Sequence, residues 1–145
     1  MGDSEKNAVR NFYETVINRQ NTVIANSLMT EDFKMHDPPP GYEGTRDGTK
    51  KFFMELFKAF PDMKLKVDQM VNEGDMVAVR VSGGGMHKGA FMGMPPSNKK
   101  INMNGMEIWR VTGGRVAESW GVWDTAGMLQ QLGVMPSPAA GAGSR

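Results

Sequence analysis

One carboxylate, Asp124, lies between a tryptophan-rich segment and a short apolar helical run, in the stretch ESWGVWDTAGMLQQLG of residues 118–133. Side chains alternate across a strand, so Trp120, Val122 and Asp124 would share one face. If that face points into an apolar cavity, desolvation raises the pKa of Asp124 above its ordinary ~3.9 and makes it a stronger general base. The simpler interpretation is a helix cap, because Asp is a common N-cap and a helical run begins at Thr125. Spacing alone favours the cap, and the two roles are compatible.

The chain has two histidines that could take part in acid–base chemistry. His87 follows RVSGGGM and shares parity with the valines of that strand, which predicts that its side chain points inward. The three glycines would allow a bulge, which would turn the side chain to the other face. His36 precedes Asp37 and three prolines at the mouth of a loop. Two histidines and one aspartate equal a facial metal triad in number, but no H-x-x-x-H spacing supports such a site, so no metal is expected.

The N-terminal half of the chain predicts three helices. Ser4 or Asp3 can cap a helix that extends to about residue 18, since apolar residues recur on one helical face. A shorter helix is expected over about residues 20–28, and a third over 49–60. Between the second and third, DFKMHDPPPGYEG indicates a short extended piece entering a loop, because three prolines cannot continue a helix or a central strand.

After Pro61 the apolar residues recur at every second position, which is typical of β-strands. Strands are expected over about residues 63–68, 76–82, 99–111 and 115–123. Helices followed by antiparallel hairpins predict an α+β fold, with three N-terminal helices and a curved antiparallel sheet that enclose an apolar cavity. A short C-terminal helix follows the last strand.

Length and composition restrict the kind of protein. The 145 residues are enough for one domain, expected over residues 1–135, and a Pro/Gly/Ala/Ser-rich disordered tail is expected over 136–145. The balance of 17 Lys and Arg against 16 Asp and Glu gives a net charge of +1 and no reason to expect a nucleic-acid or membrane partner. The chain has no cysteine, no signal-peptide core at its polar start and no apolar run of ~18 residues, so a cytoplasmic protein is expected.

Several segments together resemble one known family. They are MHDPPPG (35–41), FPD (60–62), MHKGAFMGMPPSNKKI (86–101), GMEIWRVTGGRVAESW (105–120) and WDTAGMLQQLG (123–133). In this order they resemble the SnoaL-like polyketide cyclases, or ester cyclases, and the resemblance covers about residues 5–135. It implies the cone-shaped α+β fold of the ketosteroid-isomerase superfamily.

The resemblance also implies a reaction, an intramolecular aldol ring closure on a polyketide methyl ester, without metal or organic cofactor. Asp124 matches the family's base, which would remove an acidified α-proton and later return it to the new alkoxide. A carboxylate is a weak base, so this chemistry needs a delocalised enolate and a buried site. His87 matches the family's pocket histidine, a hydrogen-bonding partner for the substrate or for Asp124, and His36 would be a second donor. With this pattern around it, general base becomes the favoured interpretation of Asp124.

Departures from the family pattern concern the substrate. Met86 stands where Thr is common before the pocket histidine, and PPSN replaces the P-P-T-G turn. The chain has 14 methionines, whose flexible side chains suit a pliable apolar cavity. Tyr13 fits the pocket or the core equally well. We expect a small apolar or aromatic polyketide-like substrate to contact Trp120, Trp123, Tyr13, Phe53, Phe57, Met92, Met103 and Met106.

Two alternative functions remain open. A cofactor-free monooxygenase or isomerase would use the same enolate of a similar apolar substrate. A non-catalytic protein would bind a small apolar ligand and show no pH-dependent turnover. In each case a homodimer or homotetramer is expected, formed through the exposed face of the sheet.

Overall fold

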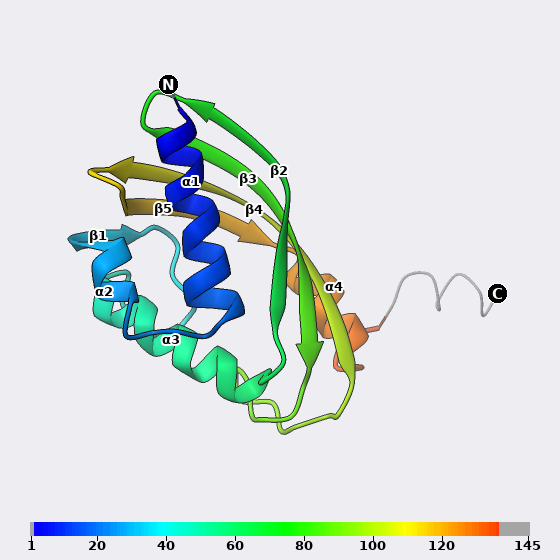
Figure 1. The fold of residues 1–145 in the computed structure, drawn as a ribbon. Coiled ribbons are helices and arrows are strands. Elements are labelled where there is room, and N and C mark those ends of the chain that lie inside the picture. Colours follow the sequence, from blue (N-terminus) through cyan, green and yellow to red (C-terminus); the bar gives the residue numbers. More distant parts are fainter. Residues whose placement is uncertain (1, 137–145) are drawn as a thin grey trace.

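Five strands form one curved sheet, and the N-terminal helices pack against it (Figure 1). The computed structural model describes residues 2–136, so the expected tail lies outside the described residues except for Pro136. The strands, in the sheet order β1-β5-β4-β3-β2, are β1 (Met29–Met35), β5 (Arg115–Trp123), β4 (Lys100–Thr112), β3 (Met76–Met86) and β2 (Lys64–Glu73).

The sheet is mixed, whereas the sequence predicted an antiparallel one. β2, β3, β4 and β5 pair antiparallel through successive hairpins, and β1 pairs parallel with β5. The difference arises because β1 is separated from β5 by most of the chain, so no hairpin turn fixes its direction. The pairing of Met35 with Ser119 brings His36 beside β5, where its backbone N–H donates to the Ser119 carbonyl at 2.8 Å.

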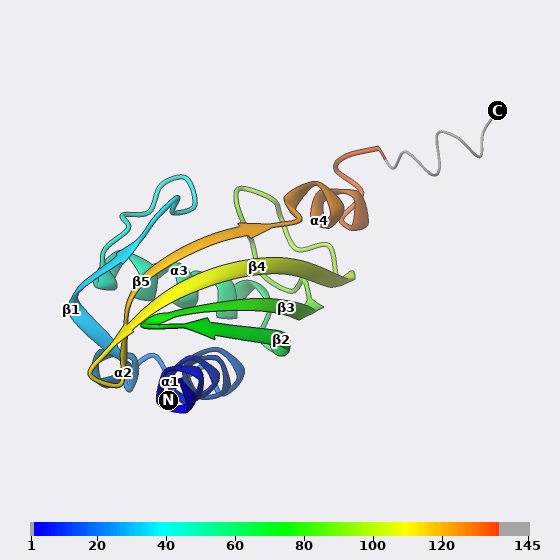
Figure 2. The same cartoon turned by 90° about the horizontal axis from the view of Figure 1, so that it is seen from above.

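The three expected N-terminal helices are present. They are α1 (Asp3–Phe12), which continues as a π-helix η1 (Tyr13–Asn18), α2 (Ala25–Leu28) and α3 (Arg46–Ala59). Figure 2 shows α1 alongside the sheet near β2, and α3 contacts β1. The first helical stretch buries the apolar face that the sequence predicts, made of Val9, Phe12, Tyr13, Val16 and Ile17.

The C-terminal end of η1 is fastened to the edge strand β2 by one side chain. Asn18 donates from Nδ2 to the Leu65 carbonyl at 2.9 Å, and its Oδ1 accepts the Leu65 N–H at 2.7 Å. This pair occupies backbone groups of an edge strand that would otherwise be open. It also fixes the position of Tyr13 over the sheet, because Tyr13 begins the same short helix.

The other face of the sheet exposes large apolar side chains. Val71, Met106, Ile108 and Val122 are 67%, 59%, 43% and 72% exposed. The strand register places Met106 opposite Val122 and aligns Val71 with Ile108 through Ala78 of β3. These four side chains are called the outer apolar face below.

The short helix α4 (Thr125–Gln131) follows β5 and begins after Asp124. The Asp124 Oδ1 accepts the Gly127 N–H at 2.9 Å. This bond satisfies one of the free N–H groups at the helix start, so the capping role predicted from the sequence is confirmed.

Replacing Asp124 by alanine should therefore lower the free energy of unfolding by ~1 kcal/mol, since the N-cap acceptor is lost. Asp124→Asn keeps an acceptor oxygen and should unfold within a few tenths of a kcal/mol of the wild type. Urea unfolding followed by circular dichroism measures both. Equal stability of the alanine variant and the wild type would show that the cap contributes nothing.

Candidate active site

An apolar cavity of about 320 Å³ lies between the helices and the sheet. Small-molecule sites typically occupy roughly 300–1,000 Å³, so this volume is at the lower end of that range. We call it the inner cavity. Its wall includes Tyr13, Phe53 of α3, Met103, Glu107 and Trp109 of β4, and Trp123 of β5.

Glu107 places a carboxyl group in the wall of the inner cavity. The Tyr13 hydroxyl donates a hydrogen bond to the Glu107 Oε1. The same hydroxyl accepts the Trp109 Nε1–H at 3.1 Å, and the two rings meet edge to face at 5.7 Å. The carboxyl group is thus held in a fixed orientation by a donor that is itself fixed.

Two glycines make room for the polar and aromatic groups of this wall. Gly121 is paired with Glu107 across β4 and β5, and a Cβ at Gly121 would lie 2.9 Å from the Glu107 Oε2. Gly105 is paired with Trp123, and a Cβ there would overlap the indole ring. The carboxyl group and the indole therefore lie directly against the backbone of the neighbouring strand.

Burial controls the protonation of both members of the pair. Desolvation raises the pKa of Glu107 from its ordinary 4.5 to about 7, while hydrogen bonds from Tyr13 and Trp123 act in the lowering direction. The pKa of Tyr13 is raised well above its usual 10, first by burial and then by the nearby Glu107 carboxylate, so its hydroxyl stays a donor. A carboxyl group with a pKa near neutrality can both accept a proton and return it.

Asp124 is exposed, and its carboxylate is turned toward the start of α4. Its neighbours Trp123 and Thr125 line the inner cavity, whereas the Asp124 side chain is not part of that wall. The structure therefore places Asp124 next to the cavity. Its role as a base stays a prediction.

The face of β5 that lines the cavity is the opposite of the expected one. Ser119, Gly121 and Trp123 form the wall, and Trp120 and Val122 point to the other face. The reason is the register, because residues directly opposite each other in an antiparallel pair share a face and these three lie opposite inward residues of β4.

Five of the eight expected contact residues line the inner cavity, namely Trp123, Tyr13, Phe53, Met92 and Met103. The remaining three do not. Trp120 stacks on His36 at 4.5 Å, and Met106 points outward because it alternates with Glu107. Phe57 is buried in the core beside Phe53.

His36 lies in the cavity wall and is held by charged neighbours. Its Nε2 is 2.8 Å from the Glu118 Oε2, and the Arg110 Nε donates to the Glu118 Oε1 at 2.7 Å. The hydrogen bonds from His36 and Arg110 lower the pKa of Glu118, so this carboxylate stays charged. The structure thus supplies a fixed imidazole at the cavity, and its part in catalysis stays a prediction.

His87 does not reach the inner cavity, in contrast to its expected place in the pocket. It is 1% exposed and stacks on Phe60. Its Nδ1 accepts the Ser97 N–H at 3.3 Å and lies 2.9 Å from the Ser97 Oγ. His87 points inward, as strand parity predicts, but it is buried in the core and does not face the cavity. Its contacts with Ser97 hold the loop that precedes β4.

Glu107 is the residue that sequence reasoning missed. It shares strand parity with Met103, Gly105, Trp109 and Val111, an otherwise apolar series. A single acid on the inward face of a strand was the available signal, because such a group is costly to bury unless it is hydrogen-bonded or protonated.

Two kinds of feature are not found in the described residues. Within residues 2–136, no group of three His, Asp or Glu side chains is arranged to hold a metal ion. In that same range no helix has the length and apolar composition needed to cross a membrane.

Comparisons with known proteins give consistent relatives. The family model described as SnoaL-like polyketide cyclase matches residues 7–132. IdmH of Streptomyces antibioticus, provisionally described as a polyketide cyclase, is 31% identical with a TM-score of 0.77, over 90% of this chain and 99% of IdmH. AclR of Streptomyces galilaeus, provisionally described as a hydroxylase, is 25% identical with a TM-score of 0.84, over 100% of this chain and 95% of AclR. A Bacillus cereus protein, provisionally described as a polyketide cyclase, is 25% identical with a TM-score of 0.78, over 91% of this chain and 82% of the Bacillus protein. A search of curated proteins found no significant match.

The raised pKa of Glu107 predicts a pH-dependent stability. The folded state holds this proton more tightly than the unfolded state, so the contribution of Glu107 to stability is fully present below pH 4.5 and is lost as the pH rises through about 7. The loss attributable to Glu107 should reach about 3 kcal/mol, and it should be absent in Glu107→Gln. Urea unfolding at several pH values measures the difference.

The exposed Glu73 provides a matched control for this titration. Glu73→Gln should keep the pH dependence of the wild type. If Glu107→Gln loses stability with rising pH as steeply as the wild type does, the raised pKa is wrong.

Proposed function

Because this chain belongs to the SnoaL-like polyketide cyclase family, we propose that it closes a ring in a polyketide-like substrate by an intramolecular aldol reaction. The Glu107 carboxyl group acts as the acid–base group. The observation that carries this proposal is a hydrogen-bonded carboxyl group in an apolar cavity, with its pKa raised to about 7. At neutral pH a substantial fraction of such groups is ionised and able to accept a proton.

The reaction needs one base and no redox change. The Glu107 carboxylate removes a proton from a carbon flanked by carbonyl groups, which leaves a delocalised enolate. The enolate carbon then bonds to a carbonyl carbon of the same molecule, and that carbonyl oxygen becomes an alkoxide. The protonated Glu107 returns the proton to the alkoxide, so the product is an isomer of the substrate.

The surrounding side chains support both the removal of the α-proton and its return to the alkoxide. Tyr13 donates to Glu107 and keeps one carboxylate oxygen oriented, so the other, beside Gly121, is the oxygen available to the substrate. The walls made by Phe53, Trp109 and Trp123 suit a flat apolar molecule and limit the access of water. A dry wall strengthens the electrostatic interactions of the enolate.

Asp124 is the competing candidate for the base, because it matches the family's aspartate in the sequence resemblance. Its two neighbours in the chain line the inner cavity. To act, however, its carboxylate would have to give up its hydrogen bond to Gly127 and turn toward the cavity. Glu107 needs no such rearrangement and is therefore the better candidate.

Paired variants decide between the two carboxylates. With an aromatic polyketide methyl ester as the substrate, Glu107→Gln should lower kcat/KM by at least ~100-fold, the usual size of a general-base effect. Asp124→Asn should change kcat/KM by less than ~3-fold, because it keeps the helix cap. The wild-type kcat/KM should rise with pH through a midpoint near 7, since the ionised form of Glu107 is the active one.

The reverse pattern would assign the reaction to Asp124. In that case Asp124→Asn would abolish turnover in a folded protein, and Glu107→Gln would cyclise the substrate at the normal rate. Ligand binding without turnover in the wild type would favour the non-catalytic alternative.

Hydroxylation is the second candidate reaction, and the likeness to AclR favours it. The same enolate can react with dioxygen instead of an internal carbonyl group. The two reactions differ in their products. Cyclisation leaves the mass unchanged, whereas the enolate and dioxygen give a hydroperoxide, which an added thiol reductant converts to the alcohol and water with a net gain of one oxygen atom. Mass spectrometry of products formed with and without dioxygen distinguishes them.

The outer apolar face is the proposed contact between copies of this chain. Its support is the row of exposed side chains that includes Val122 and Met106, which lie opposite each other on β5 and β4. Apolar patches of this kind commonly mark interaction surfaces.

A charge on the outer apolar face should therefore separate the copies. Val122→Lys should reduce the mass measured by sedimentation to that of one chain, since it would bury an unpaired charge in the contact. Val134→Lys is the matched control, because Val134 is 58% exposed and lies after α4. A wild-type protein that sediments as one chain would contradict the proposal.

A further inference from the structure

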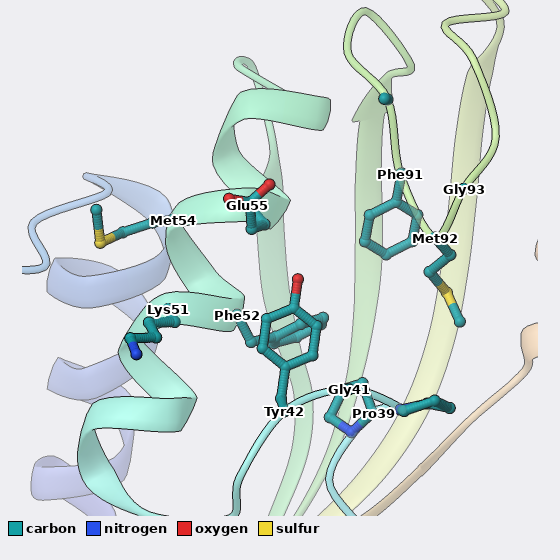
Figure 3. A pocket seen from close by; sticks show the side chains of 12 residues that line it. Pro39, Gly41, Tyr42, Lys51, Phe52, Met54, Glu55, Phe91, Met92 and Gly93 are labelled. Atoms are coloured by element: carbon teal, nitrogen blue, oxygen red, sulfur yellow. The ribbon is translucent and has the colours of Figure 1, made fainter.

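A second hollow, of about 750 Å³, adjoins the inner cavity (Figure 3). We call it the outer pocket. It lies between the proline loop after β1, the α3 helix and the loop before β4, and Figure 3 shows Tyr42 beside Phe52 with Phe91 above them. The residues that line both spaces are Pro39, Pro40, Phe52, Phe91 and Met92. The two spaces therefore meet at this shared wall.

Met92 occupies a strained position in that wall. Its φ is +50° and that of Gly93 is +78°. The backbone groups of Phe91 and Met94 exchange hydrogen bonds of 3.0 and 2.9 Å, so residues 92 and 93 are the centre of a two-residue hairpin turn. Turns with positive φ at both central residues strongly prefer Asn-Gly or Asp-Gly, and a methionine in the first position is unfavourable.

Folding alone does not account for methionine at this position. The side chain is 53% exposed, so it contributes little to the core. Strained residues of this kind collect at ligand-binding sites, and methionine is the side chain that adapts most easily to an apolar ligand. Because Met92 lines both spaces, such a ligand would bind where the two spaces meet.

We propose that the outer pocket is a second subsite, which binds a chain attached to the ring system held in the inner cavity, with Met92 contacting the substrate where the two spaces meet. This inference rests on the proposed function of the inner cavity. It specifies the substrate as a flat ring system that carries an extended apolar chain. The apolar walls at Phe52, Met54 and Phe91 suit the chain, and the rim at Lys51 and Glu55 suits a polar group at its end.

A matched pair of probes tests the second subsite. 2-Naphthol offers the ring system alone, and 6-octyloxy-2-naphthol adds an eight-carbon chain to the same ring. The wild type should bind the long probe at least ~10-fold more tightly, which corresponds to burial of about two methylene groups. Fluorescence titration of each probe gives the affinity ratio.

Two variants should reduce this preference. Ala90 lines the outer pocket and is absent from the wall of the inner cavity, so Ala90→Trp should fill the outer pocket and bring the ratio close to one without changing 2-naphthol binding. Met92→Ala should lower the ratio by ~3-fold or more. Met135→Ala is the control for non-specific binding of the chain, because this exposed methionine lies outside both spaces, and it should leave the ratio unchanged.

A further variant separates contact from folding. Met92→Asn should lose the same probe preference as Met92→Ala, but it should unfold at a higher urea concentration than the alanine variant, since Asn tolerates a positive φ. A stabilised variant with weaker long-probe binding would show that methionine is kept for the ligand.

The second subsite is contradicted if the wild type binds both probes equally, or if Ala90→Trp keeps the preference for the long probe. It is also contradicted if Met135→Ala lowers the ratio as much as Met92→Ala does. The turnover of Glu107→Gln does not depend on this ratio, so the catalytic proposal and the second subsite can fail separately.

Discussion

The hydrogen bond from Tyr13 to Glu107 joins the first helical stretch to the centre of the sheet, and the geometry of the inner cavity depends on it. A carboxyl group in an apolar cavity wall is costly unless it is paired or protonated. The structure meets that cost in both ways, since Tyr13 donates to the group and burial raises its pKa. The Trp109 indole in turn fixes the hydroxyl of Tyr13. The carboxyl group is thereby held in one orientation in the cavity wall.

The alternation of side chains along β4 and β5 gives the sheet two separate uses. Inward positions on β4 supply Glu107 and Trp109 to the cavity, while the adjacent Met106 and Ile108 form part of the outer apolar face. A shift of one residue in the strand pairing would exchange these sets, so the register determines both the site and the proposed contact between copies. The glycines opposite Glu107 and Trp123 are part of the same constraint, because any larger residue there would displace the group above it.

Much of the fold could be predicted from the sequence. Apolar periodicity gave the helices and four of the strands, and the segment containing Asp124 gave the cap of α4. The parallel pairing of β1 could not be predicted, because it depends on contacts between distant parts of the chain. The cavity-lining face of β5 was predicted incorrectly for the same reason, since local alternation defines two faces without saying which one turns inward. Glu107 could be predicted from its parity with Met103 and Trp109, because a single acid on an apolar strand face is costly to bury unless it is paired or protonated.

Burial moves the pKa of Glu107 close to neutrality, and this shift is what suits its carboxyl group to the proposed acid–base role. A ¹³C NMR titration of the glutamate side-chain carboxyl carbons tests this most directly, with the Glu107→Gln protein used to assign the signal. We expect a midpoint for Glu107 at about pH 7. A midpoint near 4.5, the ordinary value for a glutamate, would show that the group is not desolvated and would contradict the proposed role of Glu107.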